Sequence, residues 1–338
     1  MKTLENVLIS NLTTMRLGGL AKYVIEVEKV EDIEPAFLFA EEKGLKTFIL
    51  GAGANSIGKD EGFDGVILLN KIHGIEILAE TEKEVFIRAM GGEKWDDLVQ
   101  FSTKKKLSGI ELLSKIPGTV GAAPVQNIGA YGQDVASVLE NVEVFDAREK
   151  KVLTIPKEDL GFSYRKSIFN SEEKGRYFIF AITLKLEKNR KLNPPFYTSL
   201  QNYVDENNVE DFSPENLRKI VAEIRDEKLP DPEKEASSGS FFKNVYVDDT
   251  EAEKLVEKGI KVWRNGKENK INSGWLIEEA GLKNKTFHGM RVNGKAALVL
   301  INDSAKSYND LSLAREEIRE IIKEKFGFFL EQEPVEIE

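Results

Sequence analysis

Residues 116–132 read IPGTVGAAPVQNIGAYG, and this stretch indicates more about the fold than any other part of the chain. It contains four glycines and three alanines but no charged residue, whereas a structural loop of this length usually carries several charges. Small side chains remove bulk, so that a flat or extended cofactor can lie against the backbone. The few polar groups are Thr119, Gln126, Asn127 and Tyr131. The stretch therefore favours cofactor contact over a purely structural loop.

A second glycine-rich loop, GAGANSIGKD at 51–60, follows the short apolar strand expected at Thr47–Leu50. Two familiar phosphate-binding motifs almost fit it. The dinucleotide fingerprint requires a third glycine where Ser56 stands, and the P-loop requires a hydroxyl where Asp60 stands. The following EGFDG at 61–65 cannot begin a long helix in either case. The loop by itself indicates either the phosphate cradle of another fold or a tight surface turn.

Composition narrows the class of protein. The 338 residues are enough for two or three domains. A net charge of −10 argues against a nucleic-acid partner. With no cysteine and only two histidines, we expect no disulfide, thiol nucleophile or metal site. We find no apolar run long enough for a membrane span and no signal-peptide core, so we expect a cytoplasmic protein with no membrane partner.

Hydrophobic patterning predicts an α+β protein. Strands are expected at 23–27, 66–69, 84–89, 142–146 and 177–186, and helices at 31–43, 214–228, 251–258 and 310–325. The polar segment Asn193–Asp211 contains Pro194 and Pro195 and shows little periodicity, so it is expected to be a loop or domain boundary.

The two glycine-rich loops, in this order, resemble the FAD-binding domain of the UDP-N-acetylenolpyruvoylglucosamine reductase family. The resemblance continues along nearly the whole chain. It is carried by four further segments: YRKSIF at 164–169, GSFFKN at 239–244, GWLIEEAGL at 274–282 and LEQE at 330–333.

The resemblance implies an FAD-binding domain of the vanillyl-alcohol-oxidase (PCMH) type followed by a smaller α+β substrate-binding domain. We expect the first at 1–195, in two subdomains split near residue 70, and the second at 196–325, with a tail at 326–338 returning to the active site. The loop 194–201 with Tyr197 is similar to the segment that marks the first subtype. The chain departs from the family pattern at Ala52, Ala54, Val245 and Pro334.

The activity implied by the resemblance is an NADPH-dependent, FAD-mediated reduction of UDP-N-acetylglucosamine enolpyruvate to UDP-N-acetylmuramate, a step of peptidoglycan synthesis. Hydride addition to the enol ether builds negative charge on the adjacent carboxylate, which requires fixed positive groups or hydrogen-bond donors. In this reading Ser240 donates the proton, and Arg165 and Glu333 stabilise the enolate. Glu331 and Glu336 compete with Glu333 for its role.

The remaining site residues follow from the same resemblance. NADPH is expected to share the substrate's site, because both must present to one face of the flavin, and the enzyme is expected to be a monomer. Substrate contacts are expected from Tyr131, Tyr164, Tyr197, Lys228 and Asn244. FAD contacts are expected from Gly51, Ala52, Gly53, Ala54, Asn55, Ser56, Pro117, Gly118, Thr119, Gly121, Ala122, Asn127, Gly129 and Ala130.

Two other functions remain open at this stage. A flavin oxidase or dehydrogenase of the same fold would keep both glycine-rich loops without needing Ser240 or Glu333. A non-catalytic nucleotide-sugar binding protein would need no flavin at all, so the colour of the purified protein separates it from both enzymes.

Overall fold

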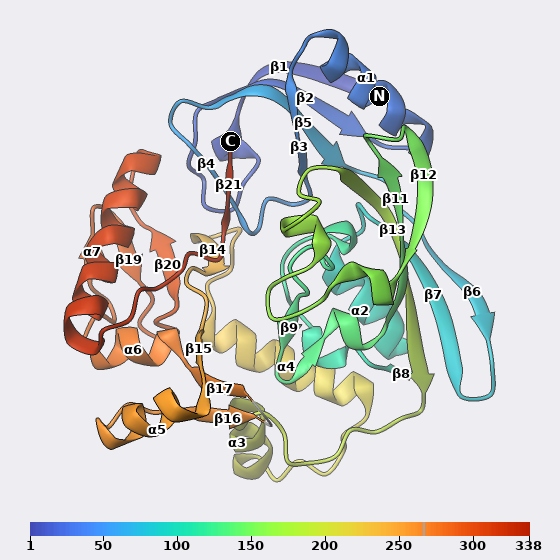
Figure 1. The fold of residues 1–338 in the computed structure, drawn as a ribbon. Helices are drawn as coiled ribbons and strands as arrows, with labels where there is room; N and C mark the ends of the chain where they lie inside the picture. Colours follow the sequence, from blue (N-terminus) through green and yellow to red (C-terminus); the bar gives the residue numbers. More distant parts are fainter. Residues whose placement is uncertain (266–267) are drawn as a thin grey trace. The chain divides into compact units, whose positions relative to one another are not determined.

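The structure, a computed structural model, describes residues 1–265 and 268–338, which divide into two compact units (Figure 1). The units differ from the domains expected from the sequence, because residues 196–227 belong to the first unit and residues 228–338 to the second. The first unit comprises Met1–Val7, Ala21–Ala52 and Asp64–Glu227. The second unit comprises Leu8–Leu20, Gly53–Phe63 and Lys228–Glu338.

The first unit begins with a sheet in the order β1-β2-β5-β3. Its elements are β1 (Lys2–Leu8), β2 (Leu20–Val27), α1 (Ile33–Glu42), β3 (Lys46–Leu50) and β5 (Phe63–Asn70). Strands β3 and β5 run parallel. The buried side chains of α1 recur at helical spacing, Ile33, Ala36 and Ala40, and pack in one core with Val66 and Leu68 of β5. This packing positions the end of β3, where the first glycine-rich loop begins.

A second sheet of the first unit has the order β12-β11-β13-β7-β6, with β8 also paired to β13. Helix α2 (Trp95–Lys104) packs on it through Trp95, Leu98 and Val99. Val120 and Ala123 of the second glycine-rich loop are buried in the same core. The strands are β6 (Ile75–Glu80), β7 (Glu84–Met90), β8 (Leu107–Ser108), β11 (Leu139–Asp146), β12 (Lys151–Pro156) and β13 (Tyr177–Lys188), and a small hairpin joins β9 (Gly129–Ala130) to β10 (Gln133–Asp134).

Two helices complete the first unit, and one of them corrects the sequence analysis. Helix α4 (Pro214–Lys228) lies where it was predicted. Helix α3 (Thr198–Glu206), however, lies inside the segment Asn193–Asp211, which was expected to be a loop. Leu200 and Val204 of α3 are buried against the apolar face of α4, so tertiary packing stabilises this short helix.

The second unit is built around a sheet in the order β14-β20-β19-β18, which shares one core with α6 and α7. These elements are β14 (Ala236–Ser240), α6 (Ser273–Glu279), β18 (Thr286–Phe287), β19 (Met290–Val292), β20 (Val299–Asn302) and α7 (Tyr308–Phe326). Ser307 caps α7 and Gly327, with φ +82°, ends it. The unit also contains β15 (Val245–Val247), α5 (Asp249–Glu257), β16 (Trp263–Asn265) and β17 (Glu268–Ile271).

The second unit also pairs the C-terminal segment with residues 56–58. Strand β21 (Val335–Ile337) pairs in parallel with β4 (Ser56–Gly58), which lies within the first glycine-rich loop. The backbone amide of Val335 donates to the Asn55 carbonyl oxygen at 2.9 Å. The tail is therefore ordered by the same segment that carries that loop.

Candidate active site

The clearest sign of a ligand site in the first unit lies where β3 ends. A Cβ atom on Gly51 would lie 2.3 Å from Thr119 Oγ1. Only glycine fits at this position unless the Thr119 hydroxyl moves. Thr119 Oγ1 is buried and has no hydrogen-bond partner among the described residues. Buried hydroxyls are normally hydrogen-bonded. An orphaned hydroxyl beside a bare glycine backbone therefore fits a cofactor that supplies the missing partner.

At two other positions of the predicted FAD loops, glycine is required by the packing of the protein backbone itself. A Cβ on Gly53, where φ is +65°, would lie 2.0 Å from the Leu12 carbonyl oxygen. A Cβ on Gly121 would lie 2.8 Å from the Ile179 carbonyl oxygen and 3.1 Å from Gly91. Both positions thus allow two backbone segments to approach closely, whatever ligand lies nearby.

The remaining predicted FAD contacts fall into two groups. Gly53, Ala54, Asn55 and Ser56 belong to the second unit, and Asn55 and Ser56 are engaged with β21. In the first unit the side-chain amide of Asn127 is committed to the protein, since its Oδ1 accepts from the Ala136 amide at 3.0 Å. Gly51, Ala52, Pro117, Gly118, Thr119, Gly121, Ala122, Gly129 and Ala130 also belong to the first unit.

Arg165 faces the second glycine-rich loop. Its Nη1 donates to the Asn127 carbonyl oxygen at 3.5 Å, and its Nη2 donates to the Gly129 carbonyl oxygen at 3.4 Å. The Arg165 backbone has φ +55°, and its carbonyl oxygen accepts from Asn170 Nδ2 at 2.9 Å. The guanidinium also lies over the Tyr164 ring, 5.2 Å from its centroid. These contacts hold the positively charged Arg165 guanidinium against the loop, whereas a typical surface arginine is freely solvated.

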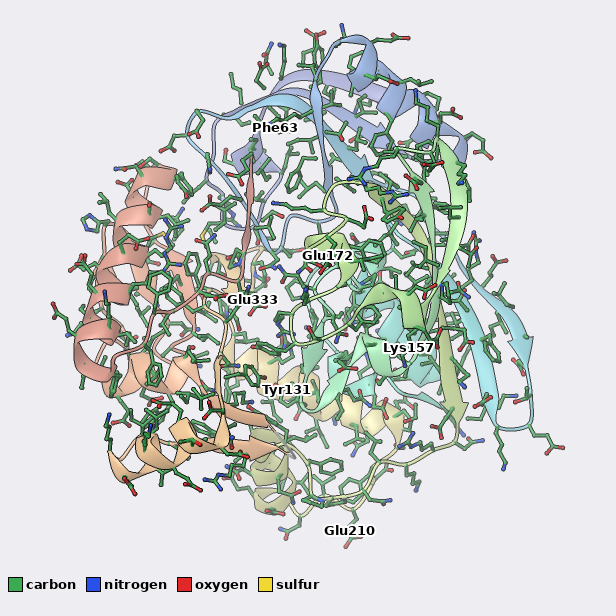
Figure 2. All side chains as sticks on the ribbon, in the orientation of Figure 1. Phe63, Tyr131, Lys157, Glu172, Glu210 and Glu333 are labelled. Atoms are coloured by element: carbon green, nitrogen blue, oxygen red, sulfur yellow. The ribbon has the colours of Figure 1, made fainter. Side chains whose placement is uncertain are left out.

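The predicted tyrosines lie around the same loop. Tyr131, labelled in Figure 2, directly follows β9 and has φ +51°. Its ring makes an edge-to-face contact with the Tyr197 ring at a centroid distance of 6.2 Å. Burial raises the pKa of Tyr131, and the neighbouring Arg225 opposes this effect. The Tyr131 hydroxyl is therefore a proton donor, not an anion, at neutral pH.

The second unit brings Ser240 and Glu333 onto neighbouring backbone segments. The Glu333 amide donates to the carbonyl oxygen of Phe241, the residue after Ser240, at 2.9 Å. The Lys243 amide donates to the Glu331 carbonyl oxygen at 2.8 Å, and Phe242 and Gln332 form a β-bridge between these two bonds. Glu333 is labelled on this tail in Figure 2. Pro334, which departs from the family pattern, directly follows these paired residues, and the backbone bonds between 241–243 and 331–333 form nevertheless.

The competing glutamates are already engaged with other charges. Lys243 Nζ lies 3.3 Å from Glu331 Oε2, so this lysine, a candidate activator of Ser240, is paired with a glutamate instead. Glu336 accepts from the Tyr308 hydroxyl at 2.5 Å and pairs with Arg315 and Lys59 at 3.1 and 3.3 Å. Burial opposes the effect, but these partners together hold the pKa of Glu336 below its ordinary value.

Two predicted substrate contacts have structural roles in the second unit. The Asn244 side-chain oxygen accepts from the Ser273 amide at 3.1 Å, at the start of α6. The Lys228 carbonyl oxygen, at the end of α4, accepts from Asn293 Nδ2 at 3.2 Å. The Lys228 bond involves only the backbone carbonyl oxygen and not the side-chain ammonium.

The described residues contain neither a metal-binding cluster nor a membrane-spanning helix. Within 1–265 and 268–338, no group of three or more His, Asp or Glu side chains is placed to hold a metal ion. No helix in the same ranges is long and apolar enough to cross a membrane.

Comparison with known proteins decides the family. Two family models match, an FAD binding domain at residues 21–154 and the UDP-N-acetylenolpyruvoylglucosamine reductase C-terminal domain at residues 231–337. UDP-N-acetylenolpyruvoylglucosamine reductase from Flavobacterium johnsoniae is 32% identical over 98% of this chain and 99% of its own. The chain belongs to the UDP-N-acetylenolpyruvoylglucosamine reductase family. The enzymes of the same name from Bdellovibrio bacteriovorus and Pseudomonas aeruginosa are 33% and 31% identical, over 97% and 98% of this chain and 97% of theirs.

A solved structure supports the fold. The reductase from Thermus caldophilus matches with a TM-score of 0.65 and 23% identity, over 99% of this chain and 98% of its own. The resemblance drawn from the two glycine-rich loops is therefore confirmed. So are the α+β fold class, with an FAD-binding domain followed by a smaller domain, and FAD as the cofactor.

Proposed function

We propose that Arg165, Ser240 and Glu333 carry the chemistry of the reaction after which the family is named, the reduction of UDP-N-acetylglucosamine enolpyruvate to UDP-N-acetylmuramate. Bound FAD supplies the hydride that reduces the carbon–carbon double bond of the enol ether. The observation that carries the assignment is the backbone bond from Glu333 to Phe241, because it holds two of the three residues on adjoining segments.

The first unit contributes charge stabilisation. Arg165 is permanently charged and can hold a carboxylate through two parallel hydrogen bonds. Its present contacts, with the carbonyl oxygens of Asn127 and Gly129, are long at 3.5 and 3.4 Å. A substrate carboxylate would offer the guanidinium shorter, charge-assisted hydrogen bonds than these two. Negative charge that develops beside this guanidinium is stabilised without any rearrangement of the loop.

The second unit contributes the proton. Ser240 ends β14, and its hydroxyl would donate to the carbon next to the carboxylate after the hydride has arrived. Serine is a poor acid in water, so the transfer depends on a strongly basic enolate carbon and on close placement. Glu333, held by its backbone beside the same segment, would help to stabilise the enolate.

The wider role follows from this reaction. The product is a precursor in peptidoglycan synthesis, and NADPH serves as the co-substrate at the substrate's own site. We also propose a cytoplasmic enzyme that acts as a monomer, for which size-exclusion chromatography with light scattering is the test. In this assignment Tyr197, Lys228 and Asn244 contact the diphosphate or sugar, while Tyr131 and Tyr164 line the flavin or substrate.

Anaerobic stopped-flow absorbance near the flavin band, at roughly 450 nm, tests the proposal. NADPH should bleach the band, and UDP-N-acetylglucosamine enolpyruvate should restore it. Bleaching without recovery would indicate a flavoenzyme with another oxidant. Absence of the band would favour a binding protein. In the Ser240→Ala variant, bleaching should persist while recovery slows, which separates the proton donor from flavin reduction.

A further inference from the structure

Helix α4 carries two arginines, two turns apart, in opposite electrostatic settings. Arg218 donates through Nη1 and Nη2 to the two carboxylate oxygens of Asp96, at 2.6 and 2.8 Å. Arg225 forms an ion pair with no carboxylate of the described residues, and its buried Nε has no hydrogen-bond partner among them. The sequence gives no hint of this difference, because Arg225 stands among Glu223, Asp226 and Glu227, as on an ordinary solvated face.

An unpaired, desolvated guanidinium is costly. A buried donor left without a partner destabilises the folded state, and a charged donor does so more strongly. Burial lowers the pKa of Arg225, against the opposing influence of Tyr131 and Asp96. Arg225 as a whole is only partly buried, so it is not sealed inside the core. A cation held in this way, close to a ligand site, is a candidate for pairing with an anionic ligand.

The neighbours of Arg225 belong to the candidate active site. The guanidinium interacts with the Tyr131 hydroxyl, and the Tyr131 ring contacts Tyr197. Two residues before Tyr131, the Gly129 carbonyl oxygen accepts from Arg165. Arg165 and Arg225 therefore flank one short segment of the first unit, 129–131, and present two separate positive charges along it.

We propose that Arg225 binds the phosphate oxygens of the substrate's nucleoside diphosphate, together with the Tyr131 hydroxyl. This assignment rests on the proposed function, since it takes the substrate to be a nucleotide sugar with two anionic parts. Arg165 then holds the enolpyruvyl carboxylate, and Arg225 the diphosphate. A guanidinium and a phenol hydroxyl are both donors, and a phosphate group offers acceptors to both at once.

The test compares variants of both arginines in the FAD-loaded enzyme, by titration with uridine diphosphate and by thermal unfolding. Arg225→Met removes the charge but keeps an unbranched apolar side chain. We expect its affinity for uridine diphosphate to fall by about tenfold to a hundredfold, with a weaker dependence on salt, because one charged hydrogen-bonding partner is lost. Its melting temperature should stay the same or rise, since the unpaired charge is gone.

Arg218→Met is the matched control. Its loss leaves Asp96 without its partner, so the melting temperature should fall while the affinity for uridine diphosphate stays unchanged. Arg225→Lys keeps the charge without the forked donors and should lose part of the affinity. Unchanged affinity in Arg225→Met, or failure of the unmodified enzyme to bind uridine diphosphate, would overturn the proposal. Both results concern nucleotide binding alone. The flavin absorbance experiment tests the proposed reaction independently of them.

Discussion

Replacing Gly51 by alanine tests the proposed FAD site by adding one carbon atom, the Cβ, beside the Thr119 hydroxyl. The new Cβ would lie 2.3 Å from Thr119 Oγ1, where ordinary contact begins near 3.4 Å. The Thr119 hydroxyl must therefore move or the backbone must shift, and overpacking of this kind costs about 1–3 kcal/mol. If the hydroxyl contacts FAD from its present position, the affinity for FAD should fall by about 5- to 150-fold.

A double-variant cycle isolates the cause. Without the Thr119 hydroxyl, the nearest atoms to the new Cβ are Thr119 Cβ at 3.5 Å and Ala122 Cβ at 3.6 Å, both ordinary contacts. Gly51→Ala should therefore cost almost nothing in a Thr119→Ala background, whereas Thr119→Ala alone should weaken FAD binding without destabilising the FAD-free protein. Additive losses in the double variant would refute the steric explanation.

The assay is titration of the FAD-free protein with FAD, followed by quenching of flavin fluorescence, together with the shift of melting temperature that FAD produces. Gly44→Ala is the control, because Gly44 has φ +65° and no atom within 4 Å of a new Cβ. It should lower the melting temperature through backbone strain and leave FAD affinity unchanged. Unaltered FAD affinity in Gly51→Ala would refute the assignment of this cradle to FAD.

Two further predictions concern the tail and an ion pair of the first unit. Glu333→Gln should slow the recovery of the flavin band in stopped flow by at least about tenfold, whereas Glu331→Gln, which alters only an exposed ion pair, should not. Arg176→Met should lower the free energy of unfolding at pH 7, because the guanidinium pairs at 2.6 Å with Asp146, whose side chain is inaccessible to solvent. The Arg176 hydrogen bond holds the pKa of Asp146 below its ordinary value, so this stabilisation is present above pH about 4 and is lost as the pH falls through the lowered pKa. In urea unfolding the two proteins should therefore converge in acid, and a difference that stays constant from pH 7 to pH 3 would contradict the linkage.

Local patterns predicted part of this fold well. Helix α4 was predicted because Leu217, Val221 and Ile224 recur at helical spacing, and because Pro214 fits a first turn. The glycine-rich stretch at 116–132 indicated a cofactor loop, since composition alone shows where side-chain bulk is absent. These features depend on residues close together in the sequence.

Features that depend on distant residues could not be predicted in this way. Helix α3 is only nine residues long, and its Leu200 and Val204 are buried in one core with the apolar face of α4. The hydrogen bond from Tyr308 to the Glu336 carboxylate joins residues 28 positions apart, and no local pattern indicates it. Arg225 has the same sequence context as a solvated arginine, and only its missing partner distinguishes it.

The division of the second unit has a consequence for protein synthesis. Its first two segments, Leu8–Leu20 and Gly53–Phe63, leave the ribosome long before Lys228–Glu338, and β4 must wait for β21 to emerge last. We therefore expect the first unit to complete most of its folding during translation while β4 stays unpaired and exposed to chaperones.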